Sequence, residues 1–138
     1  MEWFDLSDVR WVGVIVASLA AFLVGFLWFH ERALGRAWAR LAGVDLAGQR
    51  DGMVRRLVIG FVVTLVTVLL LNVLMAQLLV TTVVGGLVFG AAVGLVMRLL
   101  NHLFHDSFEN RPAGLTVING GHDVAALAVA GAVLGAFL

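Results

Sequence analysis

The residues of this sequence that could do chemistry are histidines, carboxylates and arginines gathered near the ends of long apolar runs. Imidazole and carboxylate are the usual ligands of Zn, Ni, Cu and Fe(II), so one interpretation is a transition-metal site with His102, His105 and His122 as ligands. A second is a polar cap that fixes the helix connections, and a third is a pathway for a solute or a proton. The candidate cluster comprises Arg98, Asn101, His102, His105, Glu109, Arg111, Asn119, His122 and Asp123.

Spacing within this cluster suggests how its members would meet. Arg98, His102, His105 and Glu109 recur at intervals of three and four residues, which places them on one stripe of a continuous helix. Asp123 lies in an otherwise apolar run, where a carboxylate is costly and needs a partner, for which Arg98 or His122 is the natural candidate. If its helix begins near Asn119, Asp123 lies roughly 6 Å inside the membrane edge.

Most catalytic chemistry is excluded by what the sequence lacks. With no cysteine there are no disulfides, thiolate nucleophiles, iron–sulfur clusters or cysteine-bound zinc. No stretch resembles a nucleophilic triad, a phosphate-binding loop or a paired-carboxylate site. We therefore expect a protein that is not an enzyme and that requires no cofactor, with a transition metal as the one cofactor that the histidines would suit.

Composition identifies the elements that must position these residues as membrane helices. The 138 residues are 62% hydrophobic and 13% charged, with a mean hydropathy of +1.04, against about 45–50% and about 25% in soluble domains. One small core cannot bury so much apolar surface, so lipid must solvate it. The net charge of zero gives no basic field for nucleic acid. We predict an all-α, polytopic membrane protein forming a single domain over residues 1–138.

Four transmembrane helices are expected. Trp11 to Phe29 is uncharged and is typical of a first span. The uncharged run from Leu57 to Met97 would reach roughly 60 Å as one helix, so it must cross twice, with a turn near residues 81–86. On the second helix, Thr64, Thr67, Asn72 and Gln77 are expected to hydrogen-bond to neighbouring groups. The predicted helices cover residues 11–29, 57–79, 83–104 and 115–138.

Arginine placement predicts the orientation. Only Arg10 precedes the first helix, whereas the others lie between the first two helices or near the third connection, namely Arg32, Arg36, Arg40, Arg50, Arg55, Arg56, Arg98 and Arg111. The positive-inside rule then puts both termini on the periplasmic or extracellular side of a bacterial inner membrane. Arg32, Arg36 and Arg40 share one helical face opposite Leu34, Trp38 and Leu41. This pattern predicts a short amphipathic cytoplasmic helix that ends at Gly43, the alternative being a charged connector with accidental periodicity.

Small residues recur at helical spacing and predict which helices pack closely. They include Gly13, Gly25, Gly86, Gly90, Gly94, Gly131 and Gly135. In lipid such residues let helix backbones approach, so the first, third and fourth helices should form the tight core and the leucine-rich second helix should be peripheral. The contacts could lie within or between chains. Because four helices of this length enclose little space, we expect a homo-oligomer.

The order of several motifs resembles a known family. Gly25 to Phe29, Gly35 to Trp38, Asn101 with Phe104, Phe108 to Pro112, and Asn119 with His122 together look like the bacterial domain-of-unknown-function family 1761. The sequence departs from that pattern directly after Trp28. The resemblance covers nearly the whole chain and implies a small four-helix inner-membrane protein. The matching positions are Trp28, Trp38, Asn101, Glu109, Arg111, Asn119 and His122.

Three functions remain open from the sequence. The first is a homo-oligomeric channel or transporter for a small solute or ion, with the polar cluster as its cytoplasmic mouth. The second is a structural or accessory membrane protein whose polar cap docks a partner, and the third is a histidine-ligated metal-binding membrane protein. Trp28 and Trp38 suit the aromatic belt at a membrane interface.

Overall fold

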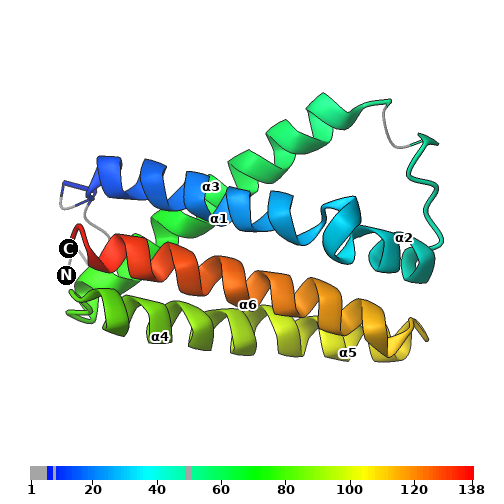
Figure 1. The fold of residues 1–138 in the computed structure, drawn as a ribbon. Helices are drawn as coiled ribbons and strands as arrows, with labels where there is room; N and C mark the ends of the chain where they lie inside the picture. The colour runs from blue at the N-terminus through cyan, green and yellow to red at the C-terminus, as the bar shows by residue number, and fades with distance from the viewer. Residues whose placement is uncertain (1–5, 8, 49–50) are drawn as a thin grey trace.

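The computed structural model describes residues 6–7, 9–48 and 51–138, and the regular elements in this part of the chain are all helical (Figure 1). Four helices are long and apolar enough to cross a membrane: Trp11–Ala42, Met53–Gln77, Val83–Phe108 and Ala113–Gly135. The predicted all-α architecture with four such helices is confirmed. Arg50, one of the arginines used to predict orientation, lies outside the described residues.

The first of these helices is broken near its end. α1 (Trp11–Trp28) stops where His30 becomes extended, and a kinked segment, η1 (Glu31–Gly35), in which Ala33 is non-helical, leads into α2 (Arg36–Ala42). The break is stabilised locally, because Nδ1 of His30 accepts a hydrogen bond from the backbone N–H of Arg32 at 3.2 Å. α2 ends as predicted at Gly43, which has a φ of 67°. The predicted connector helix is therefore a short continuation beyond the kink in the first helix.

α3 (Met53–Gln77) is tilted against the other helices, and its first half stands apart from α1 while its second half passes behind it (Figure 1). Side-chain burial follows this geometry. Residues 53–59 are all exposed, whereas Val68, Leu71, Asn72, Val73 and Met75 are buried. The helix predicted to be peripheral is thus peripheral only over its first half.

The last two spans form an antiparallel hairpin. α4 (Val83–Val93), a π-helical turn η3 (Gly94–Leu99) and α5 (Leu100–Phe108) make one rod, and a turn through Asn110 and Pro112 leads into α6 (Ala113–Gly135). This rod continues past the predicted end at residue 104. α6 begins before the predicted start at residue 115, because Pro112 occupies the position before its first turn.

α6 lies between α1 and the α4–α5 rod, so it is the central helix (Figure 1). The small residues make this possible within one chain. A methyl group on Gly86 would overlap the carbonyl oxygen of Gly131, one on Gly90 would overlap that of Leu127, and one on Gly94 would lie 2.7 Å from the Cα of Val124. The first and third predicted helices pack against α6 rather than forming a mutual three-helix contact, and the glycine ridge of α4 is occupied inside the chain.

The two ends of the molecule differ in how tightly they are packed. The start of α1, the α3–α4 turn and the C-terminus lie together at one end, here called the terminal end (Figure 1). Val14, Met75 and Leu134, in the halves of α1, α3 and α6 nearest this end, are fully buried. The opposite end, which holds α2 and the α5–α6 turn, is here called the arginine end, and the tilt of α3 opens the bundle there.

Candidate functional site

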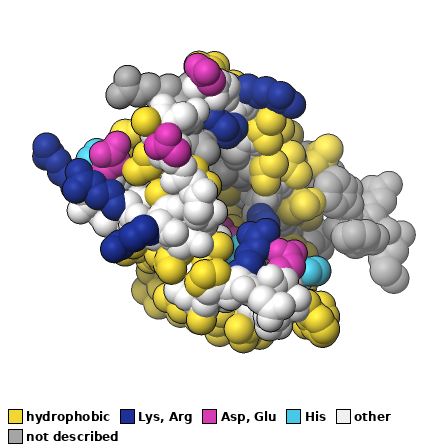
Figure 2. Space-filling view, turned by 90° about the vertical axis from the view of Figure 1, so that its right-hand side faces the viewer, with side chains coloured by type: hydrophobic (Ala, Val, Ile, Leu, Met, Phe, Trp, Pro, Cys, Tyr) yellow, Lys and Arg dark blue, Asp and Glu magenta, His cyan; other side chains and the backbone are white. Residues whose placement is uncertain are grey.

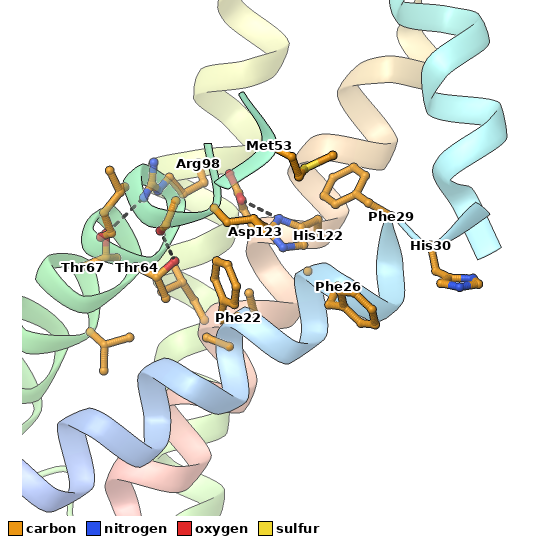
Figure 3. A pocket seen from close by; sticks show the side chains of 18 of the residues that line it. Phe22, Phe26, Phe29, His30, Met53, Thr64, Thr67, Arg98, His122 and Asp123 are labelled. Atoms are coloured by element: carbon orange, nitrogen blue, oxygen red, sulfur yellow. Dashed lines mark hydrogen bonds and ion pairs between the residues drawn. The ribbon is translucent and has the colours of Figure 1, made fainter. Parts of the chain in front are cut away.

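A cavity of about 1110 Å³ lies where α3 diverges from α1 and α6, toward the arginine end. Its walls are largely apolar and include Phe22, Phe26, Phe29, Met53, Leu57 and Val63. Its polar lining comes from Thr64 and Thr67 on α3, Arg98 on η3, and His122 and Asp123 on α6. Figure 3 shows these polar side chains close to one another, with Phe22 and Phe26 of α1 beside them.

The mouth of the cavity carries charged side chains. Glu31, Arg32 and Arg36 of the kinked segment line it, and all three are exposed. Figure 2 views the molecule from this end and shows arginines and carboxylates gathered around apolar side chains. The ring of His30 points away from the polar cluster in Figure 3. The cavity therefore has a charged rim, apolar walls and a polar cluster on its inner wall.

Asp123 is the centre of the polar cluster. Its Oδ1 lies 2.9 Å from Nδ1 of His122, and its Oδ2 lies 3.2 Å from Nε2 of His102 on α5. An ionised carboxylate only accepts hydrogen bonds, so in that state the two contacts place a proton on each of these ring nitrogens. The predicted partner His122 is therefore present, and His102 is a second one.

Arg98, the other predicted partner, is directed elsewhere. Its Nη2 donates to Oγ1 of Thr67 on α3 at 3.4 Å, and no ion pair joins Arg98 to Asp123. The reason is the π-helical turn η3, which contains Arg98 and alters the angular spacing along the rod. Arg98 thus reaches α3, while His102 in the following α-helical turn reaches α6.

Asp123 lies further along its helix than the sequence predicted. The start of α6 at Ala113 places Asp123 roughly 15 Å along the helix rather than roughly 6 Å. Arg98 lies at a similar distance from the end of α5 at Phe108, so the two residues lie at a similar level along the hairpin. Asp123 is well inside its helix, so it does not act as an N-cap.

The remaining predicted site residues lie apart from this cluster. Asn101 and His105 are exposed, with the ring of His105 against Phe104, and Glu109 pairs with Arg111 at 2.6 Å. Asn119 is half-buried on α6. The four-membered stripe is therefore divided: Arg98 and His102 contact α3 and α6, whereas His105 and Glu109, further along the rod, are exposed at its surface.

The metal interpretation gains no support from this arrangement. Among residues 6–7, 9–48 and 51–138, no group of three or more histidines, aspartates or glutamates is placed to hold a metal ion. His102 and His122 meet on opposite oxygens of one carboxylate, whereas the exposed ring of His105 contacts Phe104. The predicted trio is thus not assembled as a ligand set.

Two tryptophans predicted for a membrane interface have different surroundings. Trp28 is half-buried, and its Nε1 donates to the carbonyl of Ile118 at 3.0 Å. The ring of Trp28 packs against Gly121 on α6. The ring of His122 packs against Gly25 on α1, where an added methyl group would lie 3.0 Å from Nε2 of His122. These paired close approaches fix His122 against α1. Trp38 instead packs against Phe29, with ring centroids 5.9 Å apart.

Asp106, which the sequence places near the histidines but which is not among the predicted cluster residues, is buried in α5. Its Oδ2 accepts a hydrogen bond from Oγ1 of Thr116 at 2.7 Å, and its Oδ1 lies 4.0 Å from Nε of Arg111. These contacts close the α5–α6 hairpin beside the polar cluster. The available signal was a carboxylate ten positions before a threonine across a proline-containing turn, a pattern too common to stand out.

Of the polar side chains on α3, Thr64 and Thr67 form the predicted hydrogen bonds, whereas Asn72 does not. Thr64 and Thr67 donate to backbone carbonyls one turn earlier on α3, each at 2.8 Å. Asn72 is fully buried, and neither its Nδ2 nor its Oδ1 has a hydrogen-bond partner. The prediction that Asn72 hydrogen-bonds to a neighbour is wrong.

These features define the described part of the chain as all-helical, with four helices that are membrane-spanning candidates and a cavity open toward one end. The chain belongs to the family described as "Protein of unknown function (DUF1761)", whose model matches residues 12–135. The resemblance seen in the sequence is thereby confirmed. No curated protein and no solved structure matches the chain.

Proposed function

We propose that this protein binds a small organic solute in the cavity between α1, α3 and α6, as the first step of moving that solute across the membrane. The observation that carries the proposal is the cavity itself. Its volume of about 1110 Å³ is slightly above that of ordinary ligand pockets, about 300–1,000 Å³, and it combines apolar walls with a few converging polar groups.

The lining favours an organic solute over a bare ion. Phe22, Phe26 and Leu57 offer apolar surface, whereas a desolvated ion needs several converging oxygen or nitrogen ligands. Arg98 and Asp123 carry opposite charges on the same wall, so the cluster balances its own charge when the histidines are neutral. Such a lining suits a molecule with an apolar body and a polar group.

The fold supports a carrier rather than a permanent pore within one chain. Val14, Met75 and Leu134 are fully buried between the cavity and the terminal end, so solute passage requires these helices to move. We also propose, from the arginine distribution, that the cavity opens to the cytoplasm, that both termini face outward, and that α2 lies at the membrane surface. A homo-oligomer would use lipid-facing surfaces, because the glycines of α4 already pack against α6.

Saturation-transfer NMR on the protein in nanodiscs tests the binding step. The panel comprises small aromatic and aliphatic alcohols, amides, amines and carboxylates. Gly60→Trp is the blocked variant, because Gly60 lines the cavity and a methyl group there would lie 3.6 Å from Phe22. Val58→Trp is the matched control, since Val58 is on the same helix but 56% exposed and outside the lining.

We expect at least one chemical class to receive saturation from the wild type and from Val58→Trp but not from Gly60→Trp. Uptake of that class into proteoliposomes then tests the transport step. If all three folded proteins give the same spectra for every class, the cavity is not a solute site and the proposal is wrong.

A further inference from the structure

The clearest anomaly outside the described cluster is the side chain of Asn72 in the second half of α3. It is fully buried, and both its amide nitrogen and its amide oxygen lack a hydrogen-bond partner. Burying an amide without partners is costly, and the cost is greater where no water can reach it. A valine or leucine would fill such a core position without that cost, so the amide calls for a functional explanation.

Asn72 lies directly beyond the inner end of the cavity. Thr64, Val68 and Asn72 follow one another at intervals of four on α3, so they share one helical face. Thr64 and Val68 line the cavity, whereas Asn72 does not. The amide is therefore one helical turn, roughly 6 Å, further toward the terminal end.

The two neighbouring helices continue the cavity in the same way. Ala21 of α1 and Leu127 of α6 line its inner end together with Val68. One turn further along, Ser18 on α1 and Ala130 on α6 are fully buried, as Asn72 is. The hydroxyl of Ser18 donates to the carbonyl of Val14 at 2.7 Å, which leaves its oxygen able to accept.

The buried core is thus layered along the direction from cavity to terminal end. The inner end of the cavity is followed by a layer with two polar side chains and one small one, here called the Asn72 layer (Ser18, Asn72 and Ala130). Beyond it, Val14, Met75 and Leu134 form an apolar plug. Polar groups between a cavity and an apolar plug are what an intermediate binding position on a pathway requires.

We propose that the Asn72 layer is a second, occluded binding position for the solute. An amide offers donors and an acceptor without charge, and no charged side chain belongs to this layer. The position therefore suits a neutral hydrogen-bonding group such as a hydroxyl or an amide, which assigns the solute to the small neutral alcohols and amides. This inference rests on the proposed function, because it extends the same cavity inward.

The absence of cysteine from the chain makes the accessibility of this layer directly measurable. Single cysteines are introduced by Thr64→Cys in the cavity, Asn72→Cys in the layer and Met75→Cys in the plug, and each protein is reconstituted in liposomes. The probe is Ag⁺, added on both sides, and the loss of free thiol is followed over time. Leu74→Cys, 45% exposed on the lipid side of α3, reports reaction that does not use the pathway.

We expect Thr64→Cys to react fastest and Asn72→Cys to react at least about tenfold faster than Met75→Cys and Leu74→Cys. Adding Gly60→Trp should slow the first two reactions together, since both depend on entry through the cavity. If Thr64→Cys reacts but Asn72→Cys is as slow as Met75→Cys, the second position is refuted while the cavity stands. If Thr64→Cys is also inert, the proposed function fails as well.

A measurement on the unaltered chain guards against misfolding of the cysteine variants. In ¹⁵N-asparagine-labelled protein, the side-chain amide of Asn72 is identified by its disappearance in Asn72→Leu. We expect its hydrogens to exchange with D₂O, more slowly than those of exposed Asn101 but well before the backbone amides of the core. Exchange as slow as that of the core backbone would show a sealed site and overturn the proposal.

Discussion

The contact between α4 and α6 at Gly90 gives the sharpest test of how this bundle is held together. In Gly90→Ala, the added methyl carbon would overlap the carbonyl oxygen of Leu127 and would lie 2.8 Å from its carbonyl carbon and 3.3 Å from the Cα of Ala128. These neighbours are backbone atoms, which cannot rotate away as a side chain can. The variant can therefore be accommodated only if the two helices separate.

The size of the effect follows from the required displacement. Ordinary contact begins at 3.4 Å, so relieving the overlap with the carbonyl oxygen of Leu127 requires the helices to move apart by roughly an ångström, which also loosens the neighbouring contact between Gly86 and Gly131. Overpacking of this kind costs about 1–3 kcal/mol. The higher helix propensity of alanine stabilises the helix by about 1 kcal/mol relative to glycine. Because a displacement of this size against backbone atoms favours the upper end of the overpacking cost, we expect a net loss of about 2 kcal/mol in the free energy of unfolding.

The assay is equilibrium unfolding in mixed micelles, followed by tryptophan fluorescence and circular dichroism. Gly60→Ala is the matched control, because its methyl group would meet only Phe22, at an ordinary distance of 3.6 Å. We expect this control to be neutral or stabilised by up to about 1 kcal/mol. If both variants change stability equally, the close approach of α4 and α6 does not hold the bundle together and the argument is refuted.

Three further predictions concern the polar cluster and the topology. Asp123→Asn should lower the free energy of unfolding by about 1–3 kcal/mol, since an amide cannot accept from both histidines through two oxygens, and a double-mutant cycle with His102→Gln should show coupling of at least about 0.5 kcal/mol. Trp28→Phe should cost about 0.5–1.5 kcal/mol in the same assay by removing the hydrogen bond between α1 and α6. A reporter active only in the cytoplasm and fused after Leu138 should be silent, and a strong signal from the intact fusion would reverse the proposed orientation.

In the structure, the glycine ridge of α4 is not available to form the predicted homo-oligomer. From the sequence, the small-residue ridges were available for contacts between chains, and transport was expected to require several copies. The ridge of Gly86, Gly90 and Gly94 packs against α6 instead, and the cavity is formed by a single chain. The proposed solute binding therefore needs no second copy, and homo-oligomerisation stays a prediction that must rest on other surfaces.

The sequence by itself determined the features that depend on local composition and spacing. Long apolar runs such as Trp11 to Trp28 have to be helical in lipid, because an unpaired backbone amide there is costly. The fourfold spacing of Gly86, Gly90 and Gly94 indicated a close helix contact, and an isolated Asp123 had to have a partner. His122 could be named as that partner because the two residues are adjacent.

Only the tertiary structure decided which helices meet and where space is left between them. The π-helical turn η3 sends Arg98 to Thr67 and His102 to Asp123, which regular helical spacing does not predict. The tilt of α3 opens the cavity and leaves Asn72 buried without a partner. In a membrane protein, lipid-facing, cavity-facing and buried positions can all be apolar. The pattern along α3 therefore does not encode its tilt, which is set by packing against the other helices.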